Sequence, residues 1–212
     1  GRLSSVKLAD GLNEGLVSAG VSVLNIGQVP TPLVYFATHN SEFTSGVSVT
    51  GSHNPPDYNG FKIVIDGHTL SGDEITGIFE RIVEKKVVKA QQPGHVSSKD
   101  IVPDYTRHIA NDIQIDRRLK VVVDCGNGVP GAVAPDVLSA IGAEVESIYC
   151  EVDGNFPNHH PDPSDPNNLI DLIEVVKRSG ADIGLAFAGD GGRLGVVTAP
   201  GQMPHTDRSP VL

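Results

Sequence analysis

Residues 119–149 read LKVVVDCGNGVPGAVAPDVLSAIGAEVESIY, and this stretch decides the fold class. It begins with a short apolar run, Leu119–Asp124, which is typical of a strand buried on both faces. A helix is predicted over residues 130–141, and a second strand-like run follows over residues 143–149. Strands that alternate with amphipathic helices predict an α/β layer.

The alternation continues on both sides of this stretch. We predict helices over residues 102–113 and 167–179, and strands over residues 181–187 and 194–198. A long loop, residues 150–166, precedes the last helix. Residues 200–212 have no clear period, so we expect the chain to stop before a natural end.

The first half of the chain begins with a helix and a strand. Ser4 or Ser5 can cap the helix, which ends at Gly20, and residues 21–26 follow as a strand. A short helix after Pro32, strands over residues 46–50 and 61–65, and a helix from Ser71 to Lys86 complete this half. Residues 91–98 form a polar break. The sequence therefore predicts two consecutive α/β domains, residues 1–98 and 99–212, with mixed sheets between helices.

Composition excludes several classes of function. The 212 residues include 26 acidic and 16 basic ones, giving a net charge of −10, which argues against a nucleic-acid partner. No window approaches the roughly 18 consecutive apolar residues of a membrane helix, and nothing indicates an obligate protein partner. The start has no charged-then-apolar leader, which predicts the cytoplasm. Cys125 and Cys150 are predicted to be reduced thiols at strand ends.

The most informative loop is Thr50-Gly-Ser-His-Asn-Pro-Pro-Asp-Tyr-Asn-Gly-Phe-Lys62, between two predicted strands. Gly51 permits a sharp turn, and Asn54 with the two prolines after it stiffens the loop, so Ser52 is held at its tip. His53 beside it can handle a proton, and Lys62 on the next strand can contact phosphate oxygens. Spacing alone favours a simpler interpretation, a proline-stiffened turn whose Ser and Asn only make turn hydrogen bonds.

This loop resembles the active-serine loop of the α-D-phosphohexomutase superfamily. Four further stretches are similar to the same family: Gly1-Arg-Leu-Ser4, Val29-Pro-Thr-Pro32, Val121-Val-Val-Asp-Cys-Gly-Asn-Gly128 and Glu151-Val-Asp-Gly-Asn-Phe-Pro-Asn-His-His-Pro-Asp-Pro163. The resemblance extends nearly to Thr198. It is greatest to the bacterial phosphomannomutase/phosphoglucomutase members that accept both mannose and glucose phosphates.

The resemblance implies a function. It makes Ser52 a phosphoserine that donates its phosphoryl group to a hexose phosphate and takes one back from the 1,6-bisphosphate. It assigns proton movement and phosphate contact to His53 and Lys62, and phosphate binding to Asn54 and Arg193. It also implies Mg²⁺, with Asp190 and Ser52 as ligands, and glucose 1,6-bisphosphate as activator.

The metal loop departs from the family pattern Asp-Gly-Asp-Gly-Asp-Arg. Here the stretch is Ala188-Gly-Asp-Gly-Gly-Arg193, which keeps one carboxylate of three. Since Mg²⁺ requires several oxygen ligands near octahedral positions, we predict much weaker metal binding and little transfer. The family also usually has four domains, so the chain is expected to be a fragment or an impaired form. Truncation, loss of catalysis and an altered sequence all remain open.

Two other functions remain as alternatives. Gly126-Asn-Gly-Val-Pro-Gly131 matches the dinucleotide fingerprint Gly-x-Gly-x-x-Gly after a strand, with Glu144 and Glu146 about 20 residues on. The other alternative is a non-catalytic fragment that binds sugar phosphates. A metal site at His159, His160 and Asp162 is disfavoured, because adjacent histidines in a proline-rich loop lack ligand geometry.

Overall fold

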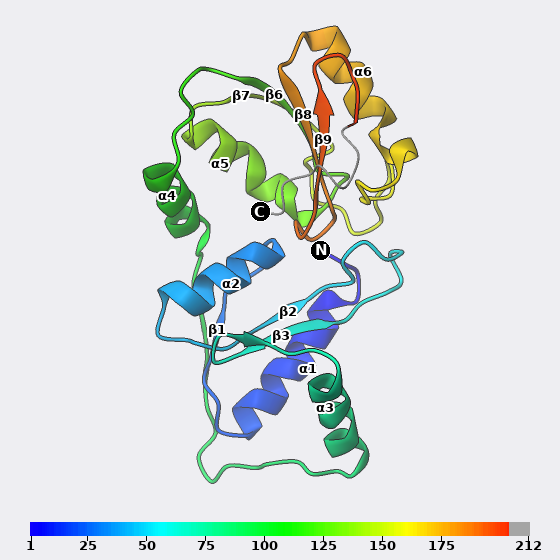
Figure 1. The fold of residues 1–212 in the computed structure, drawn as a ribbon. Helices are drawn as coiled ribbons and strands as arrows, with labels where there is room; N and C mark the ends of the chain where they lie inside the picture. Colours follow the sequence, from blue (N-terminus) through cyan, green and yellow to red (C-terminus); the bar gives the residue numbers. More distant parts are fainter. Residues whose placement is uncertain (204–212) are drawn as a thin grey trace.

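The computed structural model describes residues 1–203, and its second half is a four-stranded sheet between two helices (Figure 1). The strand order is β7-β6-β8-β9, with bounds β6 Lys120–Asp124, β7 Glu144–Ile148, β8 Ile183–Phe187 and β9 Leu194–Thr198. β6 pairs parallel with β7 and β8, while β9 pairs antiparallel with β8. The predicted mixed sheet is confirmed.

The core of this half follows from the alternation of side chains along β6. Val121 and Val123 pack in a cluster with Leu138 of α5 (Ala134–Ala140), on one face of the sheet. Val122 packs in another cluster with Leu172 of α6 (Ile170–Ser179). Successive residues of a strand point to opposite faces, so a continuous valine run is what a sheet covered on both sides requires.

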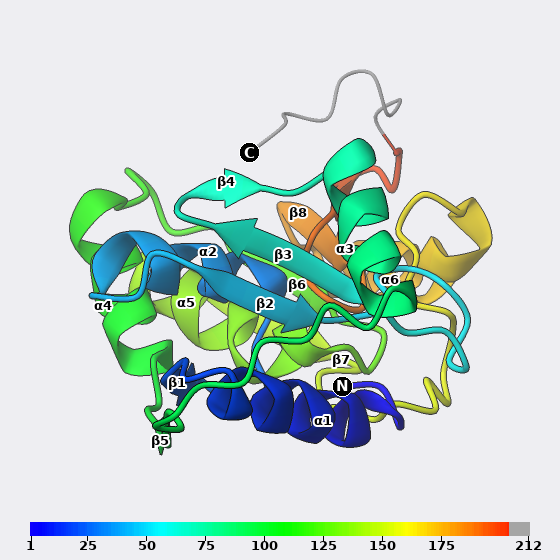
Figure 2. The same cartoon turned by 90° about the horizontal axis from the view of Figure 1, so that it is seen from below.

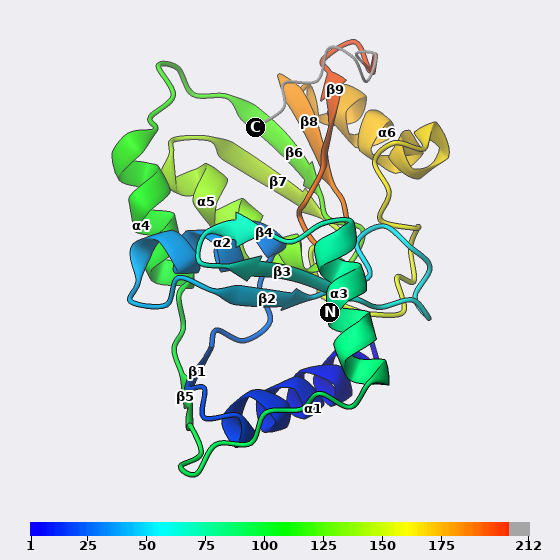
Figure 3. The same cartoon turned by 60° about the horizontal axis from the view of Figure 1, so that its bottom comes forward.

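The first half contains two small sheets. β2 (Gly46–Val49), β3 (Phe61–Ile65) and β4 (His68–Thr69) form an antiparallel sheet (Figure 2). β1 (Val23–Asn25) pairs parallel with β5 (Val96–Ser98) at some distance from it (Figure 3). The helices of this half are α1 (Ser5–Ser18), α2 (Thr31–Asn40) and α3 (Asp73–Val83).

The two halves meet through an apolar cluster. Leu33 and Ala37 of α2 pack with Ile101 and Tyr105 at α4 (Val102–Asp112), and with Val133 before α5. The Phe36 and Tyr105 rings lie edge to face, with centroids 5.3 Å apart. The cluster fixes the two layers against one another, so that loops from both can share one site.

Three of the differences between the predicted and observed elements have a clear physical cause. The polar break over residues 91–98 contains β5, whose partner β1 lies about 70 positions earlier in the chain. The predicted helix over residues 130–141 starts as a 3₁₀ turn, Val129–Ala132, and becomes α-helical only at Ala134. Likewise, Pro166–Leu169 is a 3₁₀ turn before α6. Prolines at 130, 135 and 166 lack the N–H that a continuous helix would use.

Two further expectations from the sequence concern a membrane-spanning helix and the C-terminal tail. Among residues 1–203, no helix is both long enough and apolar enough to span a membrane. Of the tail predicted to lack a period, residues 204–212 lie outside the described residues.

Candidate functional site

Ser52 occupies a strained and well-anchored turn. Its φ is +51°, in the left-handed region that non-glycine residues seldom adopt. Its N–H donates to Thr50 Oγ1 at 2.9 Å, and the Asn54 N–H donates to the Gly51 carbonyl at 3.0 Å. A Cβ on Gly51 would lie 2.5 Å from the Tyr58 carbonyl oxygen, so glycine is required there. The predicted rigid presentation of Ser52 agrees with this geometry.

Arg2 is the main support of this turn, and sequence reasoning did not assign it a role. Its guanidinium donates to the carbonyl oxygens of Ser52 at 3.0 Å and Asn54 at 2.5 Å, and also to that of Pro55. The guanidinium also lies 5.5 Å from the centroid of the Phe156 ring. Burial lowers the pKa of Arg2, although Asp190 and Asp57 act in the opposite direction. The resemblance of the Gly1-Arg-Leu-Ser4 stretch to the phosphohexomutase family was the sequence signal that could have identified Arg2 as a site residue.

Replacing Arg2 with leucine is expected to loosen the Ser52 turn. Three carbonyl oxygens lose their charged donor, which should lower the free energy of unfolding by about 1–2 kcal/mol. Hydrogen exchange of the amides over residues 51–56 should accelerate, and this is the decisive measurement. Arg2→Lys keeps the charge but not the planar fork, so it should give an intermediate effect. Unchanged exchange in both variants would contradict the assigned role.

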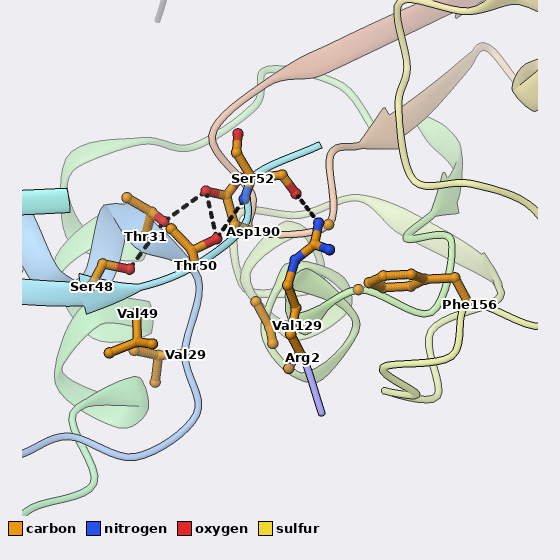
Figure 4. A pocket seen from close by; sticks show the side chains of 13 residues that line it. Arg2, Val29, Thr31, Ser48, Val49, Thr50, Ser52, Val129, Phe156 and Asp190 are labelled. Carbon is orange, nitrogen blue, oxygen red and sulfur yellow. Dashed lines mark hydrogen bonds between the residues drawn. The ribbon is translucent and has the colours of Figure 1, made fainter. Parts of the chain in front are cut away.

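Asp190 is the second centre of the site. Its Oδ2 accepts from Lys62 Nζ at 2.7 Å, Thr31 Oγ1 at 3.0 Å and Thr50 Oγ1 at 3.2 Å, and its Oδ1 accepts from the Gly192 N–H at 3.0 Å. Figure 4 shows the two threonine hydroxyls pointing at this carboxylate, with the Ser52 hydroxyl directed outward. The small cavity of about 30 Å³ beside these groups has room for little more than a water molecule.

The charge of Asp190 is fixed by its partners. Burial alone would raise the pKa of this carboxyl, but the hydrogen bond and charge of Lys62 outweigh burial, and the pKa lies below its usual value. Asp190 is 5% exposed, whereas the Lys62 side chain is 35% exposed, so the carboxylate is shielded from water and the ammonium reaches it. The structure therefore places an ionised carboxylate beside the Lys62 side chain, and this carboxylate lines the same cavity as Ser52.

The other predicted site residues lie around this centre. His53 is exposed, with Nδ1 3.4 Å from Ser52 Oγ. The Asn54 side chain is exposed on the loop, and only its backbone groups make the contacts given above. Arg193 Nη2 lies 3.4 Å from Asp162 Oδ1. Ser52 and Asp190 thus line the same small cavity, Lys62 pairs with Asp190, and the exposed His53 lies beside Ser52.

The residues present do not fit a magnesium ion. Asp190 is the single carboxylate of the loop, and its oxygens already accept four donors. Ala188 is fully buried and Gly192 has no side chain. Within residues 1–203, no three His, Cys, Asp or Glu side chains are grouped so that they could hold a metal ion. Mg²⁺ needs several oxygen ligands, which this loop does not offer.

The glycine-rich turn after β6 is occupied by the chain itself. The Val129 N–H donates to the Gly189 carbonyl at 3.1 Å, and the Asn127 N–H to the Tyr149 carbonyl at 2.7 Å. A Cβ on Gly128 would lie 2.7 Å from Gly189 Cα. A pyrophosphate would need these amides and this space. The geometry therefore explains the glycines by packing and does not favour the dinucleotide alternative.

The two adjacent histidines have separate contacts. His159 Nε2 lies 3.0 Å from Asp124 Oδ2, in a pair whose carboxylate is fully buried. Burial alone would lower the pKa of His159, but the hydrogen bond to Asp124 and neighbouring charges raise it above its ordinary value. His160 Nε2 lies 2.6 Å from the His53 carbonyl oxygen. The loop that carries the histidines therefore joins the second half to the Ser52 turn.

Replacing His159 with glutamine is expected to destabilise the fold in a pH-dependent way. A histidine with a raised folded-state pKa stabilises fully below its unfolded pKa of about 6.5, and this contribution is lost as the pH rises through the folded value. The variant should therefore lose about 1–2 kcal/mol at low pH and less at high pH. Urea unfolding across this range measures the difference. In an Asp124→Asn background the pH dependence should disappear, and its persistence there would contradict the pairing.

Cys125 and Cys150 are both free thiols, as expected. They lie at the ends of β6 and β7, where the Cys150 Sγ contacts the Ile148 carbonyl at 3.4 Å.

Two family models and several known proteins match this chain. Residues 1–88 match the family model "Phosphoglucomutase/phosphomannomutase, alpha/beta/alpha domain I", and residues 103–201 match domain II of the same family. A phosphomannomutase/phosphoglucomutase from Pseudomonas aeruginosa is 53% identical over 208 residues, covering 98% of this chain and 44% of its own length. A phosphoglucomutase from Neisseria gonorrhoeae is 49% identical over 212 residues, and the match covers 100% of this chain and 46% of the length of that protein.

A solved structure is also similar. The crystal structure of a phosphoglucomutase/phosphomannomutase family protein from Burkholderia thailandensis has a TM-score of 0.93 and 46% identity, covering 98% of this chain and 47% of that one. The chain thus spans about half the length of the relatives it matches.

Proposed function

Because the chain belongs to the phosphoglucomutase/phosphomannomutase family, we propose that it carries the serine-centred part of a phosphohexomutase site. The proposed reaction moves a phosphoryl group between C1 and C6 of glucose or mannose phosphates, through a phosphoserine and a 1,6-bisphosphate. The observation that supports it is the anchored Ser52 turn, which keeps a serine half-exposed at the cavity that Asp190, the partner of Lys62, also lines.

In the proposed transfer, Ser52 Oγ forms a bond to phosphorus of a bound hexose bisphosphate as the bond from phosphorus to the sugar oxygen breaks. The serine proton passes to His53, whose Nδ1 is 3.4 Å away, and from there to the leaving sugar oxygen. The return transfer reverses these steps. Such chemistry depends mainly on positioning and on neutralising charge.

Local cations have to overcome the acidic balance of the chain. The Lys62 ammonium has three N–H donors, and one of them is directed to Asp190. The other two can contact phosphate oxygens. Arg193 is a further candidate, because its buried Nη2 makes no hydrogen bond within the described part of the chain and has only the Asp162 carboxylate, 3.4 Å away, as an ion-pair partner. These two side chains are proposed to hold the phosphate of the substrate.

The test is to incubate the protein with glucose 1,6-bisphosphate and measure its intact mass. The proposal predicts the gain of one phosphoryl group, which peptide mapping should place on Ser52. A folded protein that binds the bisphosphate without gaining mass would instead support the non-catalytic sugar-phosphate-binding function. That second candidate is favoured by one observation, the loss of two carboxylates from the loop around Asp190.

A further inference from the structure

We propose that the Lys62 side chain takes the place that a divalent cation would have at Asp190, so that this site binds sugar phosphates independently of Mg²⁺. This inference rests on the proposed function and concerns the same pocket. It starts from the mismatch between the residues present and the ligand set of a metal, and it explains how the pocket can still present positive charge.

The first step is the saturation of Asp190. A carboxylate has about four lone-pair positions, and here four donors are within 3.2 Å of the two oxygens: Lys62, Thr31, Thr50 and the Gly192 N–H. A metal could bind only by displacing one of them. Thr31 is 4% exposed, so a displaced Thr31 hydroxyl could not readily find water instead, whereas the 35% exposed Lys62 could.

The second step is the rigidity of the arrangement. The Asp190 carbonyl accepts from the Thr31 N–H at 2.8 Å, so the same two residues are joined through backbone and side chain. Thr50 Oγ1 bonds both Asp190 and the Ser52 N–H. The carboxylate is therefore held in one orientation, and the Ser52 turn depends on it. Turning Asp190 towards a metal would disturb the turn that presents the serine.

The third step is charge. Lys62 Nζ lies 2.7 Å from Asp190 Oδ2, and no second carboxylate of this loop is present to offset a dication placed beside that ammonium. A dication beside Asp190 would be repelled at close range by Lys62, whose side chain is 35% exposed and therefore only partly screened by water. The ammonium already supplies a positive charge at Asp190, which lines the same cavity as Ser52, and its remaining donors are available to an anion.

The first experiment measures metal binding directly. Titrating the protein with Mn²⁺, whose electron paramagnetic resonance signal falls on binding, should show no saturable site below about 1 mM. Calorimetry with glucose 1-phosphate should give the same Kd in EDTA and in Mg²⁺, within about twofold. A Mn²⁺ site in the micromolar range, or a sugar-phosphate Kd improved about tenfold by Mg²⁺, would overturn the proposal.

Two variants make the test specific. A Cβ on Gly192 would lie 3.1 Å from Asp190 Oδ1 and 3.4 Å from Lys62 Nζ, so Gly192→Asp adds a carboxylate at this point. Combined with Lys62→Met, it should create a Mn²⁺ site at least about tenfold tighter than that of Gly192→Asn with Lys62→Met, its uncharged match. Equal Mn²⁺ affinity in the two folded double variants would contradict the inference.

These outcomes are separable from failure of the proposed function. Mn²⁺ binding is read without substrate or turnover, so it tests the role of Lys62 even if Ser52 gains no phosphoryl group. Conversely, a protein that gains a phosphoryl group only when Mg²⁺ is present would retain the proposed function and overturn the inference.

Discussion

Replacing Ser52 with alanine is expected to abolish phosphoryl incorporation from glucose 1,6-bisphosphate. The variant removes the single oxygen to which the phosphoryl group is proposed to bond. The fold should change little, because the N–H of residue 52 still donates to Thr50 and its carbonyl still accepts from Arg2. The expected change in the free energy of unfolding is within about 0.5 kcal/mol. Intact mass after incubation measures the effect.

The matched control is Ser22→Ala, at an exposed serine of the first half. It should gain one phosphoryl group as the original protein does. If Ser52→Ala also gains one, the nucleophile is another residue and the proposed role of the turn is contradicted. If only Ser52→Ala fails, and thermal unfolding shows that it is folded, the chemistry is assigned to this hydroxyl.

The sequence was sufficient to predict the parts of the fold that depend on residues close together in the chain. The valine run of β6 predicted a strand covered on both faces, because that burial leaves no polar alternation. The Ser52 turn was equally local, since Gly51 and the prolines act within a few residues of the serine. Its assignment to phosphoryl chemistry, however, came from resemblance and not from spacing.

The remainder depends on contacts between distant parts of the chain. β5 is exposed and has only one apolar residue, Val96, and it is a strand because it pairs with β1. Arg2 acts on carbonyls about 50 positions later. The side-chain donors to Asp190 are Thr31 of α2, Thr50 of the loop after β2 and Lys62 of β3. No local sequence pattern encodes the convergence of these donors on one carboxylate, so the sequence could not predict that all acceptor positions of Asp190 are occupied.

Replacing a glycine of the turn after β6 is expected to have the second large effect, a loss of stability. Replacing Gly131 with alanine is expected to lower the free energy of unfolding by about 3 kcal/mol or more. Its Cβ would overlap the Cys150 carbonyl oxygen and lie 2.6 Å from the carbonyl carbon, and these are backbone atoms that cannot rotate away. The cause is lack of space and not backbone torsion, because Gly131 does not have a positive φ. Urea unfolding measures the loss.

Gly11→Ala is the matched control, because a Cβ there meets nothing within 4 Å on helix α1. It should raise the free energy of unfolding by about 0.5–1 kcal/mol, as alanine favours helices over glycine. The comparison of Gly131→Ala with Gly11→Ala also tests whether the Gly-x-Gly-x-x-Gly turn over residues 126–131 serves packing or nucleotide binding. If the turn serves packing, Gly131→Ala is severely destabilised and the original protein shows no saturable change in NADH fluorescence. A Gly131→Ala variant as stable as the original, together with saturable cofactor binding by the original protein, would require the glycines to serve a nucleotide.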